Sequence, residues 1–279
     1  MRYQEVLLRA FAFSSVSRWP RHRWYILPYH DVPKNCAEAF EKQVKWLKER
    51  FEVATISEAL RRLGDARHTS PLLTITFDDA EKSVYETVLP ILEGHNLKAC
   101  TYAVPGYVKQ RKFKLGGKIG FAMHWSELKE WLARGHEVGA HSLTHIPLTY
   151  CSDQRLCQEL LESKNILEDK LGIEILHFAY PFGIFNRRIE TLIREQNIYY
   201  TVATTRRGTN SPKSCTYRLY RIQVHPGFRP QDVALRMRAA ERFGWVWRLR
   251  SAGKYPLQGR HICLMKFPRK LLATILHEP

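Results

Sequence analysis

Short apolar segments alternate with amphipathic segments of helical length over residues 24–225. This alternation is typical of parallel α/β proteins, in which a crossover helix follows each buried strand. The predicted strands cover residues 24–30, 72–77, 98–104, 136–140, 177–180, 199–204 and 219–224. The predicted helices cover residues 37–50, 56–63, 83–94, 125–134, 152–171 and 187–196. Because no linker interrupts this run, we predict one closed or nearly closed barrel over residues 24–225, preceded by a lead-in, residues 1–23.

Composition and motifs exclude several classes of protein. With 279 residues, 44% of them hydrophobic, and no low-complexity tract, the chain is neither disordered nor collagen-like. It lacks GxGxxG after the first strand and GxxxxGK(S/T) anywhere, which removes the support for dinucleotide-binding and P-loop proteins. No uncharged apolar run reaches about 18 residues, the length that predicts a membrane-spanning helix. The six cysteines form no CxxC pair and indicate reduced, mostly buried thiols.

Positive charge is concentrated toward the carboxyl end of the chain. The net charge is +17, and residues 226–279 contain 11 Lys and Arg against 3 Asp and Glu. Within this segment, residues 233–250 predict a basic helix with Pro230 near its start. We expect a basic helical extension, residues 226–279, that packs on the barrel or faces an anionic membrane. Nucleic acid is disfavoured as a partner, because the sequence has no RNP-type, zinc-finger or helix-turn-helix pattern.

Two adjacent carboxylates, Asp78 and Asp79, follow the apolar segment 72–77. In α/β barrels, functional sites are built where the strands end. Adjacent carboxylates repel each other unless a cation or a proton relieves them. A metal bound by one would leave the other free to act as a base, whereas a structural role would be a helix cap ahead of Glu81.

Two histidines four residues apart, His141 and His145, follow the predicted strand 136–140. In a helical turn this spacing places both imidazoles on one face, where they can bind one ion. One aspartate and two histidines would supply three ligands and leave open positions for water and substrate. The alternative is a chance spacing, and His136 fits a surface or packing role better than the role of a further ligand.

A third segment, Pro181-Phe182-Gly183, follows the predicted strand 177–180. Proline and glycine fix a tight bend, and taken alone such a segment predicts a turn. At the end of a barrel strand, a bend of this kind can also aim a backbone N–H at a developing oxyanion.

Together these segments resemble the motifs of the polysaccharide deacetylase family, carbohydrate esterase family 4. That family has TFDD followed by a small residue, then HSxxH or HTxxH, then a strand that ends in PYG or PFG. The matching segments, downstream of Tyr29-His30-Asp31-Val32, are Thr76-Phe77-Asp78-Asp79-Ala80, His141-Ser142-Leu143-Thr144-His145 and Pro181-Phe182-Gly183. The resemblance spans residues 24–225 and implies a distorted (β/α)7 barrel with a zinc-type site.

The resemblance also implies a role for each motif residue. Asp79, His141 and His145 would bind a divalent metal, and Asp78 would be the general base that takes a proton from the attacking water. The backbone N–H of Phe182 would help to hold the oxyanion. Zinc suits this ligand set, although cobalt, nickel or iron also fit it.

The chain departs from the family pattern at two points. Many members carry an arginine that orients the base at the position of Ala179, and strand order makes Arg221 the candidate replacement. The family's general acid is often a histidine in a final Leu-x-His strand, which this chain lacks. His225 is the candidate substitute, with His30 and Asp31 as alternatives, unless the substrate has a leaving group that needs no strong acid.

We therefore expect a metal-dependent carbohydrate N-deacetylase, a hydrolase of carbon–nitrogen bonds other than peptide bonds. Its expected substrate is an N-acetylated sugar of a polysaccharide or a lipid-linked glycan precursor. The alternative is a carbohydrate-binding protein on a deacetylase-like barrel with impaired turnover. Because Val6-Leu7-Leu8 followed by Arg9 is a poor secretory core, we expect a cytoplasmic enzyme of glycan biosynthesis, peripheral at the inner face of the membrane.

Overall fold

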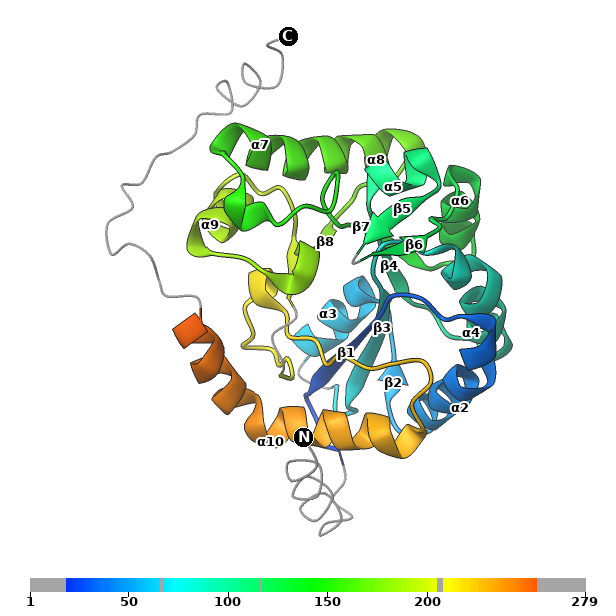
Figure 1. Ribbon diagram of the computed structural model, residues 1–279. Coiled ribbons are helices and arrows are strands. Elements are labelled where there is room, and N and C mark those ends of the chain that lie inside the picture. The colour runs from blue at the N-terminus through cyan, green and yellow to red at the C-terminus, as the bar shows by residue number, and fades with distance from the viewer. Residues whose placement is uncertain (1–18, 66–67, 116, 205–207, 255–279) are drawn as a thin grey trace.

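The computed structural model describes residues 19–65, 68–115, 117–204 and 208–254. Its centre is a curved parallel sheet surrounded by helices (Figure 1). In sheet order the strands are β1 (Trp24–Tyr29), β3 (Leu72–Phe77), β4 (Cys100–Ala103), β7 (Glu137–Ala140), β8 (His177–Ala179) and β9 (Thr201–Ala203). The short strand β2 (Glu52–Val53) pairs with the first residues of β3. Apart from β2, the order in the sheet follows the order in the chain, as expected when each crossover leads to the neighbouring strand.

Helices alternate with these strands as the hydrophobic pattern predicts. They are α2 (Ala37–Lys48), α3 (Ile56–Gly64), α4 (Leu89–Gly94), α5 (Pro105–Gln110), α6 (Trp125–Ala133), α7 (Asp153–Cys157), α8 (Ser163–Leu171), α9 (Arg187–Glu195) and α10 (Pro230–Lys254). Two π-helical segments, Val84–Val88 and Gln158–Glu162, lead into α4 and α8. The predicted helix over residues 152–171 is therefore continuous from α7 to α8, with the π-helical segment between them.

The apolar residues form two cores, one on each side of the sheet. The larger core lies between the sheet and the outer helices and includes Phe40, Phe77 and Trp131. The smaller core joins strand residues such as Trp24 and Tyr102 to Ile56 and Ala59 of α3. Helix α3 contacts the first residues of the strands, which leaves the carboxyl ends of the strands available for a site.

The gap between β9 and β1 is closed by residues 219–222 rather than by a strand. Leu219 exchanges two backbone hydrogen bonds of 2.9 Å with the β9 segment, and the Ile222 N–H donates to the Ile26 carbonyl of β1 at 2.9 Å. The predicted strand over residues 219–224 is therefore wrong. The segment makes one bridge and then passes from one strand edge to the other, so neither neighbour offers it a continuous ladder.

A small hairpin and a short helix beside the barrel have no counterpart in the sequence prediction. The strands β5 (Phe113–Leu115) and β6 (Lys118–Gly120) form an antiparallel pair outside the main sheet. Helix α5 links β4 to this pair. The elements are short, and Pro105 and Arg111 bound the helix, so no hydrophobic period can develop over them.

Helix α10 packs on the barrel through its first half. Three of its apolar side chains are buried at helical spacing: Val233, Met237 and Ala240. The Tyr25 hydroxyl of β1 donates a hydrogen bond to Glu241. The predicted basic helix over residues 233–250 is confirmed by the longer helix α10. The domain limits at residues 23 and 225 stay predictions, and the late apolar segment 261–266 lies outside the described residues.

The described residues include five of the six cysteines of the chain. The free thiols there are Cys36, Cys100, Cys151, Cys157 and Cys215. Among these, Cys100 and Cys157 are buried and the other three are at least partly exposed, so the expectation of mostly buried thiols is wrong for the described residues. Cys263 lies outside the described ranges.

Among the described residues, no helix combines the length and the apolar character that crossing a lipid bilayer requires.

Candidate active site

The carboxyl end of β3 carries the two adjacent aspartates into a tight turn. The Asp78 N–H donates to the Tyr29 carbonyl of β1 at 2.9 Å and so continues the strand register. Asp79 and Ala80 then adopt φ values of 69° and 48°. This left-handed backbone costs about 1–3 kcal/mol per non-glycine residue and persists where the surrounding contacts impose it. After the turn, the Asp78 carboxylate meets an arginine, while the Asp79 carboxylate meets two histidines.

The two histidines come from the loop that follows β7. The His141 N–H donates to the Ala103 carbonyl of β4 at 2.9 Å and ends the sheet ladder. Ser142 and His145 adopt φ values of 63° and 58°, and the His145 N–H donates to the Ser142 Oγ at 3.0 Å. The helical turn considered from the spacing is not present. Instead, the left-handed residues coil the loop and bring the two imidazole centroids to 4.8 Å.

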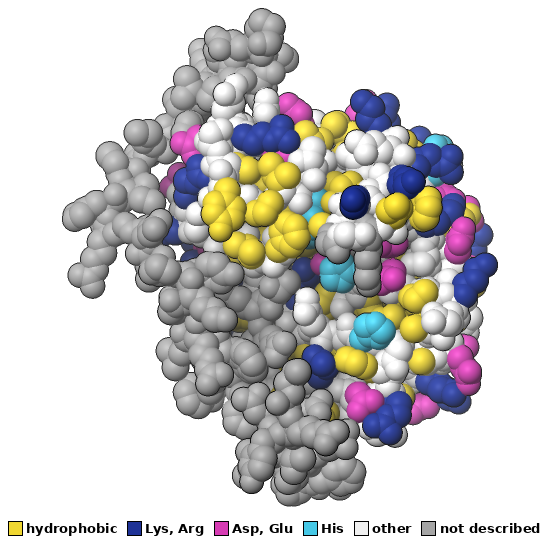
Figure 2. Space-filling view, viewed as in Figure 1, with side chains coloured by type: hydrophobic (Ala, Val, Ile, Leu, Met, Phe, Trp, Pro, Cys, Tyr) yellow, Lys and Arg dark blue, Asp and Glu magenta, His cyan; other side chains and the backbone are white. Residues whose placement is uncertain are grey.

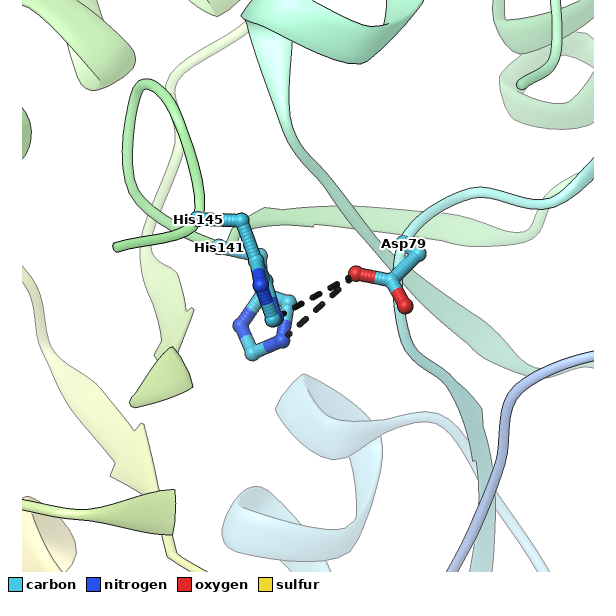
Figure 3. A group of neighbouring side chains, drawn as sticks. All are labelled: Asp79, His141 and His145. Atoms are coloured by element: carbon cyan, nitrogen blue, oxygen red, sulfur yellow. Dashed lines mark ion pairs between the residues drawn. The ribbon is translucent and has the colours of Figure 1, made fainter. Parts of the chain in front are cut away.

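Asp79, His141 and His145, hereafter the triplet, converge on one point in the buried floor of the site. The Asp79 Oδ1 lies 3.5 Å from the His145 Nε2 and 4.0 Å from the His141 Nε2, and Figure 3 shows both imidazoles facing the carboxylate. The His141 Nδ1 lies 2.8 Å from the Ala179 carbonyl oxygen. Because a carbonyl only accepts, Nδ1 carries the proton and Nε2 presents its lone pair to the triplet.

The donor chemistry of the triplet fits a divalent cation. Burial lowers the pKa of His141 to about 4 and that of His145 to about 3, so both rings are neutral near pH 7. Burial, together with the charges of Asp78 and Glu81, raises the pKa of Asp79 well above its usual value. The buried Asp79 Oδ1 also has no hydrogen-bond donor among the described residues. A cation would supply the missing positive partner, and two imidazole nitrogens with one carboxylate oxygen are ligands that zinc prefers.

Arg221 makes a bidentate ion pair with Asp78. Its Nη1 lies 2.6 Å from Oδ1 and its Nη2 lies 3.0 Å from Oδ2, while its Nε donates to the Thr204 carbonyl at 2.9 Å. The guanidinium is fully buried. Burial alone would raise the pKa of Asp78, but the charge and the hydrogen bonds of Arg221 lower it below its usual value. A guanidinium therefore stands at Asp78 although residue 179 is alanine.

Of the two histidines considered as the general acid, His30 lies at Asp78 and His225 makes other contacts. The His30 Nε2 is 3.9 Å from the Asp78 Oδ2, and the side chain is 48% exposed at the rim. The His225 Nδ1 accepts a hydrogen bond from the Gly227 N–H, and its ring packs against Phe228. Since β1 is the sheet neighbour of β3, the residue that follows β1 falls beside the residue that follows β3.

The remaining residues singled out in the sequence also have defined positions. Phe182 adopts φ 58° in the turn after β8, and its ring centroid lies 4.7 Å from that of His145. His136 is buried in a stack with Trp131, with 3.9 Å between centroids, and its Nδ1 accepts from the Ala99 N–H. Phe182 thus borders the triplet, whereas His136 has the packing role expected for it.

A cavity of about 790 Å³ opens near the residues that follow the aspartate turn, but neither Asp78 nor any residue of the triplet lines it. Its walls include Asp31, Glu81, Arg111 and Phe121. This volume lies within the range of about 300–1,000 Å³ typical of small-ligand sites. Figure 2 shows histidine side chains near the middle of the face in view, next to hydrophobic side chains.

Tyr107 is a site residue that sequence reasoning missed. Its ring centroid lies 5.8 Å from that of His145, and burial together with the charge of Asp79 raises its pKa to about 12. The residue belongs to helix α5, which no sequence pattern predicts. No motif in the sequence could have pointed to it.

Comparisons with known proteins agree with the fold and the motifs. The model of the polysaccharide deacetylase family matches residues 65–201. YxkH of Bacillus subtilis strain 168, which carries a polysaccharide deacetylase assignment, is 28% identical over 212 residues, or 72% of this chain and 71% of that protein. The poly-beta-1,6-N-acetyl-D-glucosamine N-deacetylase of Staphylococcus aureus is 25% identical over 195 residues, or 66% of each protein.

Solved structures share the barrel. The Streptococcus pyogenes deacetylase PplD in complex with acetate has a TM-score of 0.67 at 23% identity, covering 78% of this chain and 99% of that one. IcaB from Ammonifex degensii has a TM-score of 0.65 at 24% identity, covering 79% and 100%. These likenesses confirm the predicted (β/α)7 barrel of the polysaccharide deacetylase type. Since the family model, the relatives and the barrel agree with the motifs on β3, β7 and β8, the chain belongs to the polysaccharide deacetylase family.

Proposed function

We propose that the protein is a metal-dependent hydrolase that removes N-acetyl groups from the sugars of a polysaccharide or a lipid-linked glycan precursor. The observation that carries the proposal is the position of an ionised, arginine-bound Asp78 directly beside the triplet. Hydrolysis of an amide by water needs a base and an electrophile side by side. The Staphylococcus aureus relative favours N-acetylglucosamine units as the substrate.

The side chains of this site have complementary roles in the proposed reaction. A divalent metal, zinc by its donor set, supplies Lewis acidity toward the acetamide carbonyl and water when the triplet holds it. Asp78 accepts the proton of the attacking water, and Arg221 keeps its carboxylate ionised and fixed. The Phe182 N–H donates to the oxygen that gains negative charge. The products are acetate and a free amine.

We assign the general acid to His30 rather than to His225, because His30 lies 3.9 Å from Asp78 and faces the rim. The variant His30→Ala is expected to lower kcat on N-acetylglucosamine oligomers by about 10²-fold or more, since an amine leaves only with a proton. On 4-nitrophenyl acetate, whose leaving group needs no proton, the variant should keep the wild-type rate. Measuring kcat on both substrates checks the assignment.

The matched variant for this test is His225→Ala, which removes the other histidine considered. Its rates should stay within a few-fold of wild type on both substrates, because the His225 ring contacts Gly227 and Phe228. A selective loss on the oligomer in His225→Ala, with none in His30→Ala, would show that the acid has been misassigned.

Arg221→Ala is expected to change both stability and pH dependence. Breaking a buried ion pair leaves the Asp78 carboxylate without a counter-charge and lowers the free energy of unfolding by about 3–5 kcal/mol. The pKa of Asp78 rises when the guanidinium is lost. Because Asp78 is a base only when ionised, the acid limb of the kcat profile should move to higher pH. Urea unfolding and pH–rate profiles measure the two effects.

The control for this variant is Arg218→Ala in the same segment. Arg218 pairs with Glu190 and is 45% exposed. Its loss should leave the pH profile in place. An Arg221→Ala enzyme with full activity and an unshifted profile would remove Arg221 from the site.

Product analysis separates hydrolysis from the alternative, a carbohydrate-binding protein with impaired turnover. Incubation with N-acetylglucosamine oligomers should release acetate and free amine in equal amounts. One reason for the alternative, the alanine at position 179, loses weight because Arg221 meets Asp78. Metal uptake and oligomer binding without release of acetate from any N-acetylated sugar would favour the binding role.

The cellular setting of the enzyme stays a prediction. We propose a cytoplasmic protein at an anionic membrane surface, on the basis of the +17 net charge and its concentration toward the carboxyl end. Within helix α10, Arg238 pairs with Glu241, and its guanidinium lies 3.6 Å from the centroid of the Trp19 ring. Part of the basic charge therefore stabilises packing on the barrel.

A further inference from the structure

Glu159 is a fully buried carboxylate that the proposed reaction does not use. It lies in the π-helical segment between α7 and α8, behind the loop that carries the two histidines. Such π-bulges are frequent at functional sites. We propose that Glu159 is a positioning residue that holds the ligand loop, residues 141–145, in the conformation that presents His145 to a metal. This inference rests on the proposed function of the triplet.

Hydrogen bonds from the loop converge on the Glu159 side chain. Its Oε2 accepts from the Leu143 N–H and the Thr144 N–H, each at 2.9 Å. Its Oε1 accepts from the Thr144 Oγ1 at 2.5 Å and from Arg155 at 2.7 Å. Hydrogen bonds to an ionised acceptor contribute about twice as much as neutral ones, so one carboxylate fixes two consecutive loop residues.

The contacts of Glu159 lie where the loop backbone is most constrained. Leu143 and Thr144 stand between the two left-handed residues, Ser142 and His145. Left-handed residues other than glycine persist only where the surroundings impose them. Without the carboxylate, the Thr144 N–H would lose this acceptor, the Leu143 N–H would keep the Glu159 backbone carbonyl at 3.1 Å, and the loop would gain conformational freedom. His145 is the ligand most affected, since it directly follows the anchored pair.

A second contact holds the opposite side of the loop. The Gly106 N–H of α5 donates to the Leu143 carbonyl at 3.0 Å. A Cβ atom at Gly106 would lie 2.8 Å from that oxygen, which is closer than real contacts allow. The loop is thus held between α5 and Glu159, and Arg155 adds a second charged contact, since its Nη2 donates to the Thr144 Oγ1 at 3.2 Å.

Metal titration tests the inference on the full-length protein with Zn²⁺ and Co²⁺ as probes. After chelator treatment and removal of the chelator, wild type and Glu159→Gln are titrated with Zn²⁺ against a chromogenic competitor. We expect Glu159→Gln to raise the Kd for Zn²⁺ by about 10-fold and Glu159→Ala by up to about 100-fold, the range found for groups that orient metal ligands. The visible spectrum of bound Co²⁺ should change in the same order.

Two further variants separate positioning from general stability. Glu190→Gln changes another buried glutamate, which lies on helix α9 and pairs with Arg218. It should lower the unfolding temperature and leave the Kd for Zn²⁺ unchanged. Arg155→Ala removes a partner of Glu159 whose side chain is 42% exposed. Arg155→Ala should fold and raise the Kd for Zn²⁺ by a few-fold, so this variant replaces Glu159→Ala in the test if Glu159→Ala is insoluble.

The possible results are distinct. Wild-type Kd values and Co²⁺ spectra in both Glu159→Gln and Arg155→Ala overturn the positioning role, even if the variants are less stable. A wild-type protein that takes up no Zn²⁺ overturns the proposed function itself. Raised Kd values in the Glu159 variants, with an unchanged value in Glu190→Gln, support the inference.

Discussion

Replacing Asp78 by asparagine is expected to lower kcat for acetate release from N-acetylglucosamine oligomers by about 10²–10⁴-fold, the usual contribution of a general base. The amide has the size of the carboxylate but does not accept a proton from water near neutral pH. The triplet keeps its ligand atoms, so Zn²⁺ binding should stay within a few-fold of wild type. Steady-state kinetics and Zn²⁺ titration of the same preparation give both quantities.

The control for Asp78→Asn is Asp169→Asn, the same substitution at a side chain 75% exposed on helix α8. It should match wild type in both measurements. An Asp78→Asn enzyme with kcat within tenfold of wild type would contradict the role of Asp78 as the base. A loss of Zn²⁺ binding equal to the loss of kcat would instead make Asp78 part of the metal site.

Replacing Asp79 by alanine is expected to remove both metal binding and hydrolysis. Without Asp79, the site keeps two neutral histidines and has no anionic ligand for a cation. Because the site is buried, a cation whose charge is not compensated is penalised there. Lewis acidity contributes several kcal/mol to such reactions, so kcat should fall by about 10³-fold or more. Metal content after dialysis and kcat are the measurements, and His141→Ala should behave in the same way.

His136→Gln provides the matched control, because His136 is a buried histidine that directly precedes β7, the strand that leads to His141, and its ring packs on Trp131. We expect this variant to be less stable than wild type but to bind Zn²⁺ normally. Zinc in wild-type amounts in purified Asp79→Ala would contradict the ligand role of the triplet. Normal hydrolysis by a metal-free Asp79→Ala enzyme would contradict metal dependence.

Much of the barrel could be predicted because its strands are short, continuous apolar runs that end in polar residues. The segment before Asp78 reads LLTITF, and every residue of that strand is buried. The predicted order of strands and helices from β1 to β9 matches the structure for this reason, apart from β2, α5, β5 and β6, which were not predicted. Hydrophobic periodicity depends only on which face of an element is buried, which the sequence records directly.

The parts of the fold that could not be predicted depend on contacts between residues that are distant in the sequence. The segment at 219–222 has the composition of a strand, but its position between two strand edges decides that it forms one bridge. The left-handed conformation of His145 follows from acceptors such as the Ser142 Oγ and from the loop anchor at Glu159, neither of which leaves a periodic signal. Propensity favours other conformations for histidine, and tertiary contacts override it here.

The candidate site also has residues that the sequence predicts and contacts that only the structure gives. Asp78, Asp79 and His141 end buried strands, so the sequence places them at one edge of the barrel. Arg221 could be proposed from strand order, but only the structure gives its two hydrogen bonds to Asp78. The proximity of His30 to Asp78 follows from the β1–β3 pairing, a neighbour relation that a single sequence does not state.

The most direct test of metal-dependent N-deacetylation is acetate release from N-acetylglucosamine oligomers by wild-type protein stripped of metal, measured before and after addition of Zn²⁺. We predict no release above background from the stripped protein and recovery of release as Zn²⁺ approaches one equivalent. Equal release before and after the addition, from protein shown to be metal-free, would contradict the account.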